Sequence, residues 1–276
     1  MLDTAPYIPP VVSDVVIDLY HGDKVSVDFS MVKSKGIAAV ILKATQGIDF
    51  VDPAFAQRVA NARAAGLLVG AYHFMDANSP VEQMAHFLSV VGATDGILLA
   101  VDFEAYERSQ PTVIQAATAV MTVKSVTGRF PVLYTGRYML TAPNAMLSQC
   151  PLWLAEYGSR PVCPPGWSQW KLWQHTDGLV GSGVVPVAGI GPCDRSRFAG
   201  TIDQLKAWWP AATTLRWNAA FRGDPPASVA SYVGKVVLPV GIEPTTSPLP
   251  RECSTTELRQ HSGSQTGPRC DRKAIH

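Results

Sequence analysis

The sequence lacks the patterns by which metal sites and disulfide frameworks are usually recognised. Its 276 residues include five cysteines without any C-x-x-C pair, and an odd count scattered over a long chain argues against a disulfide framework. The six histidines form no H-x-x-x-H or H-E-x-x-H pattern, which disfavours a metal hydrolase. We therefore interpret the cysteines as reduced and expect neither a metal nor another cofactor.

Charge and long apolar runs are also scarce. The charged fraction is 16% and the net charge +1, which gives no reason to expect a nucleic-acid partner. No apolar run approaches the roughly 20 residues of a membrane span. The N-terminus, Met1-Leu-Asp-Thr-Ala-Pro6, lacks the basic and apolar regions of a signal peptide.

Strand and helix patterns alternate along the first 140 residues. The apolar runs predict strands at 15–20, 37–45, 67–74, 97–101 and 131–135, and the helical patterns lie at 27–36, 52–66, 79–92 and 111–127. Asp52 is expected to act as the N-cap of the second helix, with Pro53 at its first position. Beyond residue 140, strands at 152–157 and 171–175 are separated by Pro- and Gly-containing loops, and a last helix is predicted at 201–209.

This rhythm predicts an α/β fold with parallel strands joined by right-handed crossovers. We predict a TIM-like barrel with about five β/α units followed by three further strands, spanning residues 12–210. An open doubly wound sheet is the alternative, but the chain has no G-x-G-x-x-G phosphate fingerprint.

Two acids follow the predicted fourth strand in Gly96-Ile-Leu-Leu-Ala-Val-Asp-Phe-Glu104. Because side chains alternate along a strand, Asp102 and Glu104 should point to the same side. Two neighbouring carboxylates should push at least one of them toward its protonated form. Glycosidic cleavage needs a carboxylic acid beside a carboxylate. A solvated strand end is the simpler interpretation of an isolated D-x-E.

Other predicted strands also end in acids or aromatic residues, and in a barrel such strand ends share one edge. The candidate catalytic residues are Glu104, Asp102, Asp18 and Asp194; the candidate substrate-binding residues are Tyr72, Phe74, Tyr134, Trp153, Tyr157 and Trp173. Acids with aromatic rings suit a sugar-binding groove. Taken singly, Asp18 could be a turn residue, Asp194 could cap a turn, and Trp153 and Trp173 are expected more often as barrel filling.

The order of these motifs resembles glycoside hydrolase family 25, the lysozymes that cut peptidoglycan between N-acetylmuramic acid and N-acetylglucosamine. The resemblance is carried by Ile17-Asp-Leu-Tyr-His-Gly22, Ile41-Leu-Lys-Ala-Thr-Gln-Gly47, Ala65-Gly-Leu-Leu-Val-Gly-Ala-Tyr-His-Phe74, Val101-Asp-Phe-Glu104, Leu152-Trp-Leu-Ala-Glu-Tyr157, Leu172-Trp-Gln174 and Asp194-Arg-Ser-Arg-Phe-Ala-Gly200. It implies a barrel of five strand–helix units plus three strands. It also implies that Glu104 is the general acid/base and that Asp102, Asp18 and Asp194 line the site. Tyr72, Tyr134 and Tyr157 resemble its sugar-contacting residues.

The chain departs from many family members at Leu19-Tyr20 and at Gln46, where many carry Glu, but neither change touches the four acids. A chitinase-like hydrolase is one alternative function, although its longer D-x-x-D-x-D-x-E run is absent here. A non-catalytic glycan-binding barrel is another. The resemblance leaves open whether Asp102 attacks directly or steadies a nucleophile supplied by the substrate's acetamido group.

The resemblance also sets expectations for partners and localisation. A wall-cutting enzyme without a signal peptide is expected to stay in the cytoplasm until a holin-type pore former releases it. We expect a monomer that acts on peptidoglycan glycan strands, with no membrane span.

The tail at 211–276 has a different character and does not resemble the family. It has eight basic and five acidic residues and is rich in Pro, Gly, Ser and Thr, so we predict that it is disordered. Residues 241–245 and 253–258 can be encoded by codons whose reverse complements read as the T-arm and D-arm of a transfer RNA. We hypothesise that the reading frame at 241–258 crosses an antisense transfer RNA gene, which the gene's DNA sequence can refute.

Truncation after about residue 215 should therefore leave activity and stability unchanged. Thermal unfolding and clearing of cell-wall suspensions by the truncated and full chains provide the comparison. A lower unfolding temperature or slower clearing would show that the tail matters.

Overall fold

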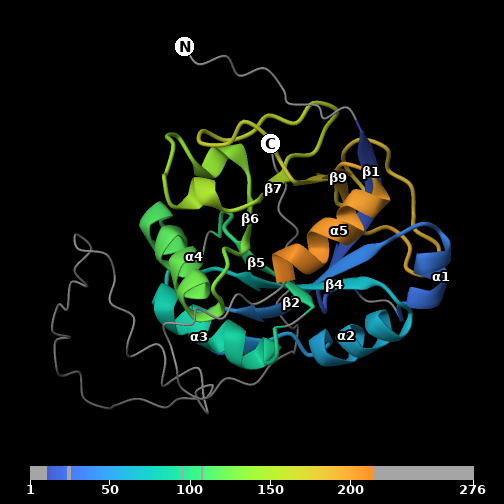
Figure 1. Cartoon of the computed structure of the whole chain (residues 1–276), viewed down its shortest axis with the longest axis horizontal. Coiled ribbons are helices and arrows are strands. Elements are labelled where there is room, and N and C mark those ends of the chain that lie inside the picture. Colours follow the sequence, from blue (N-terminus) through green and yellow to red (C-terminus); the bar gives the residue numbers. More distant parts are fainter. Residues whose placement is uncertain (1–10, 24–25, 95, 107, 214–276) are drawn as a thin grey trace, which may run out of the picture. The chain divides into compact units, whose positions relative to one another are not determined.

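Eight strands pair side by side and close into a barrel in the computed structural model, which describes residues 11–23, 26–94, 96–106 and 108–213 (Figure 1). The barrel strands are β1 (Val12–Leu19), β2 (Ala39–Gln46), β4 (Leu68–Phe74), β5 (Ile97–Asp102), β6 (Val132–Thr135), β7 (Leu152–Ala155), β8 (Leu172–Thr176) and β9 (Asp194–Ala199). A ninth strand, β3 (Phe50–Val51), pairs with β2 outside the closed ring.

Seven barrel strands, from β1 to β8, run parallel to their neighbours, as predicted. The last strand differs, because β9 runs antiparallel to both β8 and β1 and closes the ring between them. This result confirms the predicted TIM-like α/β barrel. It also locates the third of the further strands, which the sequence pattern did not.

Five α-helices accompany the barrel in the described residues: α1 (Phe29–Ser34), α2 (Phe55–Ala64), α3 (Pro80–Val91), α4 (Val113–Thr127) and α5 (Ile202–Thr213). The first four follow β1, the β2–β3 pair, β4 and β5, and their apolar faces cover the outside of the barrel. After β6 the chain forms only two short 3₁₀ turns, η1 (Arg137–Met139) and η2 (Leu147–Gln149). The fifth helix comes after β9.

Helix starts largely follow the capping residues of the sequence. Ser79 accepts a hydrogen bond from Glu82 N at the start of α3, and Thr112 forms a capping box with Gln115 at the start of α4. The expectation for Asp52 is wrong, because α2 begins at Phe55 and lacks a side-chain cap. Instead, the buried Asp52 carboxylate accepts hydrogen bonds from the backbone N–H of His21 and of Ala54, and so ties the loop after β1 to the start of α2.

The inside of the barrel is apolar in its lower part, the end at which the parallel strands begin. Ile41, Leu98 and Phe198 point inward there, and Trp153 fills the space above them while its Nε1 donates to Ser196 Oγ at 2.8 Å. α5 closes this end of the barrel, since Trp209 is buried and its Nε1 donates to Val69 O at 3.1 Å. Burying an aromatic side chain in this way contributes roughly 3–5 kcal/mol relative to alanine.

The described residues contain no helix that is long and apolar enough to cross a membrane. Their three cysteines, Cys150, Cys163 and Cys193, are free thiols. The structure carries α5 through Thr213, three residues past the expected end of the barrel at 210. The rest of the expected tail, with segment 241–258, lies outside the described residues.

A buried histidine links the barrel wall to α3. Thr45 Oγ1 and His73 Nδ1 are 2.8 Å apart, and His73 Nε2 and Gln83 Oε1 are 3.1 Å apart. The amide of Gln83 also donates to the backbone O of Asp76 and of Asn78, which fixes the loop after β4. Burial lowers the pKa of His73 to about 3, so the ring stays neutral in the folded protein.

This depressed pKa should make stability fall as the pH is lowered. The unfolded chain takes up a proton at His73 near pH 6.5, whereas the folded chain does not do so until about pH 3. The free energy of unfolding should lose roughly 1.5 kcal/mol between pH 6.5 and 5 from this group alone. Chemical denaturation across that range measures it, with His73→Gln as the test and His86→Gln as the control. Equal pH slopes for the wild type and His73→Gln would contradict the assignment.

Candidate active site

Four acids lie at the edge of the barrel where the parallel strands end. Asp18 is next to last in β1, Asp102 ends β5, and Glu104 follows two residues later. Asp194 begins β9, and because this strand runs antiparallel its first residue meets the ends of the others. Asp18 and Asp194 are paired neighbours across the two strands. The structure thus brings together four acids that the sequence places on three separate segments.

Gln174 connects the acidic and aromatic side chains of this edge. Its Nε2 donates to Asp18 Oδ2 at 2.9 Å. Its Oε1 accepts hydrogen bonds from Tyr134 Oη at 2.7 Å and from Tyr157 Oη at 3.3 Å. Tyr134 in turn lies beside Asp102 in the register of β5 and β6. One amide therefore fixes two phenols and one carboxylate from three other segments of the chain.

The site is strongly acidic and shielded from water. Burial, followed by the nearby charge of Asp194, raises the pKa of Asp18 well above its usual value, against the lowering effect of the Gln174 hydrogen bond. The charges of Asp23 and Glu104 raise it further. Clustered carboxylates in low dielectric resist simultaneous ionisation. This arrangement favours a neutral carboxyl in the cluster, although the shift falls on Asp18. The expectation of a protonated member in the Asp102–Glu104 pair stays a prediction.

Three tyrosines are affected by the charges of these acids. Burial raises the pKa of Tyr72, Tyr134 and Tyr157, and the charge of Asp18 together with other nearby acids raises each pKa further. The phenols therefore stay protonated and can donate hydrogen bonds. Phe74 ends β4 beside Asp102, and its ring meets that of Tyr106 edge-on at 5.4 Å.

The two candidate tryptophans lie elsewhere. Trp153 is inside the barrel, 2% exposed, with its ring edge-on to Tyr134 at 4.8 Å. Trp173 is 3% exposed on the outer side of β8, where Nε1 donates to Glu156 O and Arg197 lies over the ring. Alternation along β8 explains this, since inward Gln174 obliges its neighbour Trp173 to face outward.

Lys43 is a further residue at this edge that the sequence analysis did not assign to the site. It follows inward-facing Ile41 by two positions in β2, so alternation could have predicted its place. Its ammonium lies 4.8 Å from the centre of the Phe74 ring and 2.7 Å from Gln46 Oε1. The side chain is buried and adds a positive charge to the edge of the barrel that carries the acids. The sequence analysis likewise includes Gln174 in the Leu172-Trp-Gln174 motif but assigns it no role in the site.

Within the described ranges, no group of three or more His, Cys, Asp or Glu side chains is arranged to hold a metal ion. The chemistry that these side chains can perform themselves is proton transfer and stabilisation of positive charge. Paired carboxyl groups beside hydrogen-bonding phenols suit cleavage of a glycosidic bond.

Comparison with known families gives the decisive observation. The profile described as "Glycosyl hydrolases family 25" matches residues 17–184, which include three of the four acids. The chain belongs to this family. As a family 25 member it is a glycoside hydrolase, and the family assignment argues against the chitinase-like alternative.

Similar proteins agree with this assignment. Lysozyme M1 of Streptomyces globisporus is 31% identical over 211 residues, which cover 69% of each chain. An N,O-diacetylmuramidase of a Chalaropsis species is 31% identical over 205 residues, or 66% of this chain and 92% of the relative. The crystal structure of a bacterial lysozyme from Streptomyces coelicolor superposes with a TM-score of 0.63 at 30% identity and covers 72% of this chain and 99% of that one.

Replacing Gln174 with Ala should impair this family 25 site without removing an acid. The change removes the hydrogen bond that lowers the pKa of Asp18, so that pKa should rise. We expect kcat to fall roughly 10- to 100-fold, since a loss of positioning of about 1.4–2.7 kcal/mol has this effect. If ionised Asp18 is required, the acid side of the pH–rate profile should move to higher pH. Gln57→Ala, on the exposed side of α2, is the control; an unchanged rate and profile in Gln174→Ala would contradict the positioning role.

Proposed function

We propose that this protein is a lysozyme that hydrolyses peptidoglycan between N-acetylmuramic acid and N-acetylglucosamine. The observation that carries the proposal is the convergence of Asp18, Asp102, Glu104 and Asp194 at one edge of a family 25 barrel. The names of two similar proteins, a lysozyme and an N,O-diacetylmuramidase, support the choice of substrate.

Glu104 is proposed as the general acid and base. It lies just beyond β5, half-buried, and its charge acts on Tyr134, Tyr138 and Asp18. In the first step its carboxyl proton passes to the glycosidic oxygen as the bond to the sugar carbon breaks. In the second step its carboxylate withdraws a proton from the water that attacks the same carbon.

Asp102 is proposed to stabilise the positive charge that develops on the sugar carbon. It ends β5 between Phe74 of β4 and Tyr134 of β6, so its position is fixed by strand pairing on both sides. Both routes keep the anomeric configuration: direct attack by Asp102, and attack by the substrate's acetamido oxygen with Asp102 as its partner. Trapping of a covalent glycosyl–enzyme would favour the first.

Asp18 and Asp194 are proposed to bind and polarise the sugar beside the scissile bond. Asp18 Oδ2 is held by Gln174, while Oδ1 has no hydrogen-bond partner among the described residues. A buried oxygen without a partner costs roughly 1–3 kcal/mol, so a substrate hydroxyl at Oδ1 would recover that energy. A neutral Asp18 would also leave the cluster with less repulsion while Glu104 holds its proton.

A non-catalytic glycan-binding barrel is the remaining alternative. Such a protein has no need of a carboxyl donor, and replacing Glu104 would not change what it does. All four acids are present and converge here, which favours catalysis.

Glu104→Gln should abolish the proton donor and leave the fold intact. We expect the rate on purified peptidoglycan to fall roughly 10²- to 10⁴-fold, as measured by new reducing ends and their identification as N-acetylmuramic acid. Glu82→Gln, an exposed carboxylate in the first turn of α3, is the matched control. Near-normal hydrolysis by folded Glu104→Gln would refute the assignment, and reducing ends of N-acetylglucosamine would refute the bond specificity.

Two statements about the whole protein stay predictions from the sequence. We propose that the enzyme acts as a monomer, which its mass in solution would test. We also propose that it reaches the wall from the cytoplasm with the help of a holin-type pore former. Active enzyme in the medium of unlysed cells that express it alone would contradict the second proposal.

A further inference from the structure

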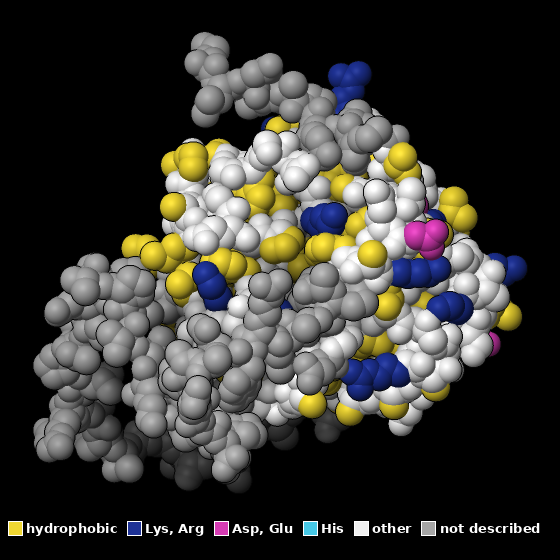
Figure 2. Space-filling model, viewed as in Figure 1, with side chains coloured by type: hydrophobic (Ala, Val, Ile, Leu, Met, Phe, Trp, Pro, Cys, Tyr) yellow, Lys and Arg dark blue, Asp and Glu magenta, His cyan; other side chains and the backbone are white. Residues whose placement is uncertain are grey.

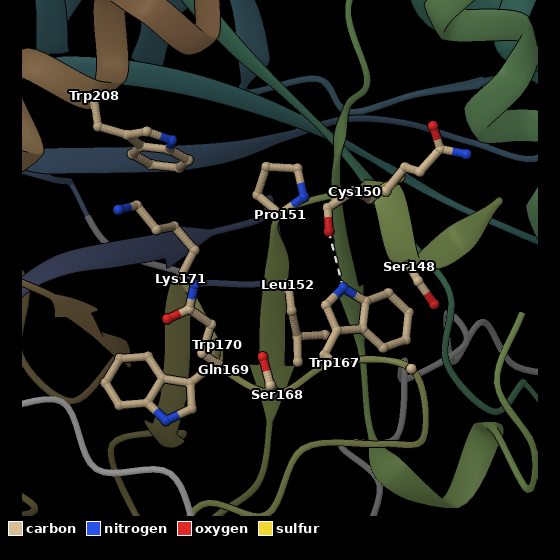
Figure 3. A pocket seen from close by; sticks show the side chains of 12 residues that line it. Ser148, Cys150, Pro151, Leu152, Trp167, Ser168, Gln169, Trp170, Lys171 and Trp208 are labelled. Atoms are coloured by element: carbon tan, nitrogen blue, oxygen red, sulfur yellow. Dashed lines mark hydrogen bonds between the residues drawn. The ribbon is translucent and has the colours of Figure 1, made fainter. Parts of the chain in front are cut away.

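A second candidate binding site lies at the opposite edge of the barrel. A cavity of about 390 Å³ is lined by residues that precede β7 and β8 and by Trp208 of α5 (Figure 3). The acids of the active site lie where the parallel strands end, whereas this cavity lies where β7 and β8 begin. It is therefore separate from the candidate active site.

The cavity combines aromatic faces with hydrogen-bonding groups. Trp167 and Trp208 are partly exposed, and the exposed amides of Gln149 and Gln169 lie beside them. Lys171 contributes an ammonium, and in Figure 3 its side chain extends alongside the Trp208 ring. Partly exposed indole faces pack on the C–H surface of sugar rings, while amides bond their hydroxyl and acetamido groups. These features match a carbohydrate better than a purely apolar ligand.

The aromatic rings and the cation are held in place by their neighbours. Trp167 Nε1 donates to Cys150 O at 2.9 Å. The Trp208 ring lies 5.7 Å from that of Phe198, and Lys171 Nζ lies 4.7 Å from the Phe198 ring centre and 5.4 Å from that of Trp208. A site with fixed side chains loses little conformational entropy when a ligand binds.

Positive charge surrounds this edge. Helices α1, α2 and α4 end here, because each runs back along the barrel after its strand, and their last turns carry Lys33, Arg63 and Lys124. In the view that has α5 at the front, Lys and Arg side chains are spread over the visible face and few acidic ones are seen (Figure 2). Basic residues complement helix carboxyl ends, and positive charge at this edge of the barrel also favours an anionic ligand.

We propose that this cavity is a second binding site for the peptidoglycan glycan strand, recognised through its sugar rings and through the carboxylates of the peptides attached to it. The inference rests on the proposed function, since it assigns the same polymer to both sites. Peptidoglycan supplies acetamido sugars for Trp167 and Trp208 and carboxylates for Lys171, while chitin lacks the carboxylates. Binding on the face away from the acids would hold the enzyme on an insoluble wall without blocking the groove.

Cosedimentation with purified peptidoglycan, stripped of teichoic acid, tests the proposal in the full chain. A Glu104→Gln background prevents digestion of the wall during the measurement. Adding Trp208→Ala or Lys171→Gln should weaken binding at least five-fold, and adding Lys206→Gln, an exposed lysine of α5, should not. In the active enzyme, Trp208→Ala and Lys171→Gln should leave hydrolysis of short soluble glycan fragments within two-fold of wild type, which also shows that they fold.

Several results would overturn the proposal. If both variants bind the wall as well as Glu104→Gln alone, the cavity is not a binding site for the wall. Loss with Lys171→Gln but not Trp208→Ala would exclude sugar stacking, and an equal effect of Lys171→Gln on chitin would exclude carboxylate recognition. Dependence on teichoic acid would assign the site to phosphate. If the wild type cuts neither soluble fragments nor peptidoglycan, the proposed function fails instead. Cosedimentation measures wall binding without hydrolysis, so the two failures can be distinguished.

Discussion

The pairing of β9 with β1 on one side and β8 on the other is the constraint on which the site depends. β9 is the only barrel strand in the described residues that runs against its neighbours, and its reversal brings Asp194 beside Asp18. If the register of β9 shifted by one residue, Asp194, Ser196 and Phe198 would all turn outward. The partner of the Trp153 indole, the filling of the barrel and one of the four acids would then be lost at the same time.

The barrel interior changes character along its axis. Its lower part is filled by apolar side chains and by α5, with Trp153 and Ser196 marking the boundary. Above that level the inward positions carry Asp18, Lys43 and Gln174 instead. Because the apolar part is buried and closely packed, charges at the polar end are weakly screened by solvent, which strengthens their mutual influence. The shared pKa effects on the tyrosines follow from this placement.

Most of the fold and much of the site could be predicted from the sequence. Alternation and glycine stops located the parallel strands, and the paired acids after β5 pointed to the edge where the structure brings all four acids together. β9 escaped because its Asp-Arg-Ser-Arg-Phe pattern has little apolar character, although its inward residues do alternate. Gln174 connects the site through three hydrogen bonds to segments far apart in sequence, and no local sequence pattern predicts such contacts. The place of Trp173 could not be predicted from its neighbours in the sequence either: it is adjacent to Gln174 but faces the other side of the strand.

The position of β9 also bears on how the chain is made. β1 is the first barrel strand to leave the ribosome, yet one of its edges has no partner until residues 194–199 have been synthesised. α5, which closes the lower end through contacts 140 residues apart in sequence, follows later still. Throughout most of synthesis the nascent sheet is thus an open one, with an unpaired strand edge and an uncovered apolar floor. Such surfaces are where intermediates associate with other chains, so this topology needs chaperones most until β9 and α5 have been synthesised.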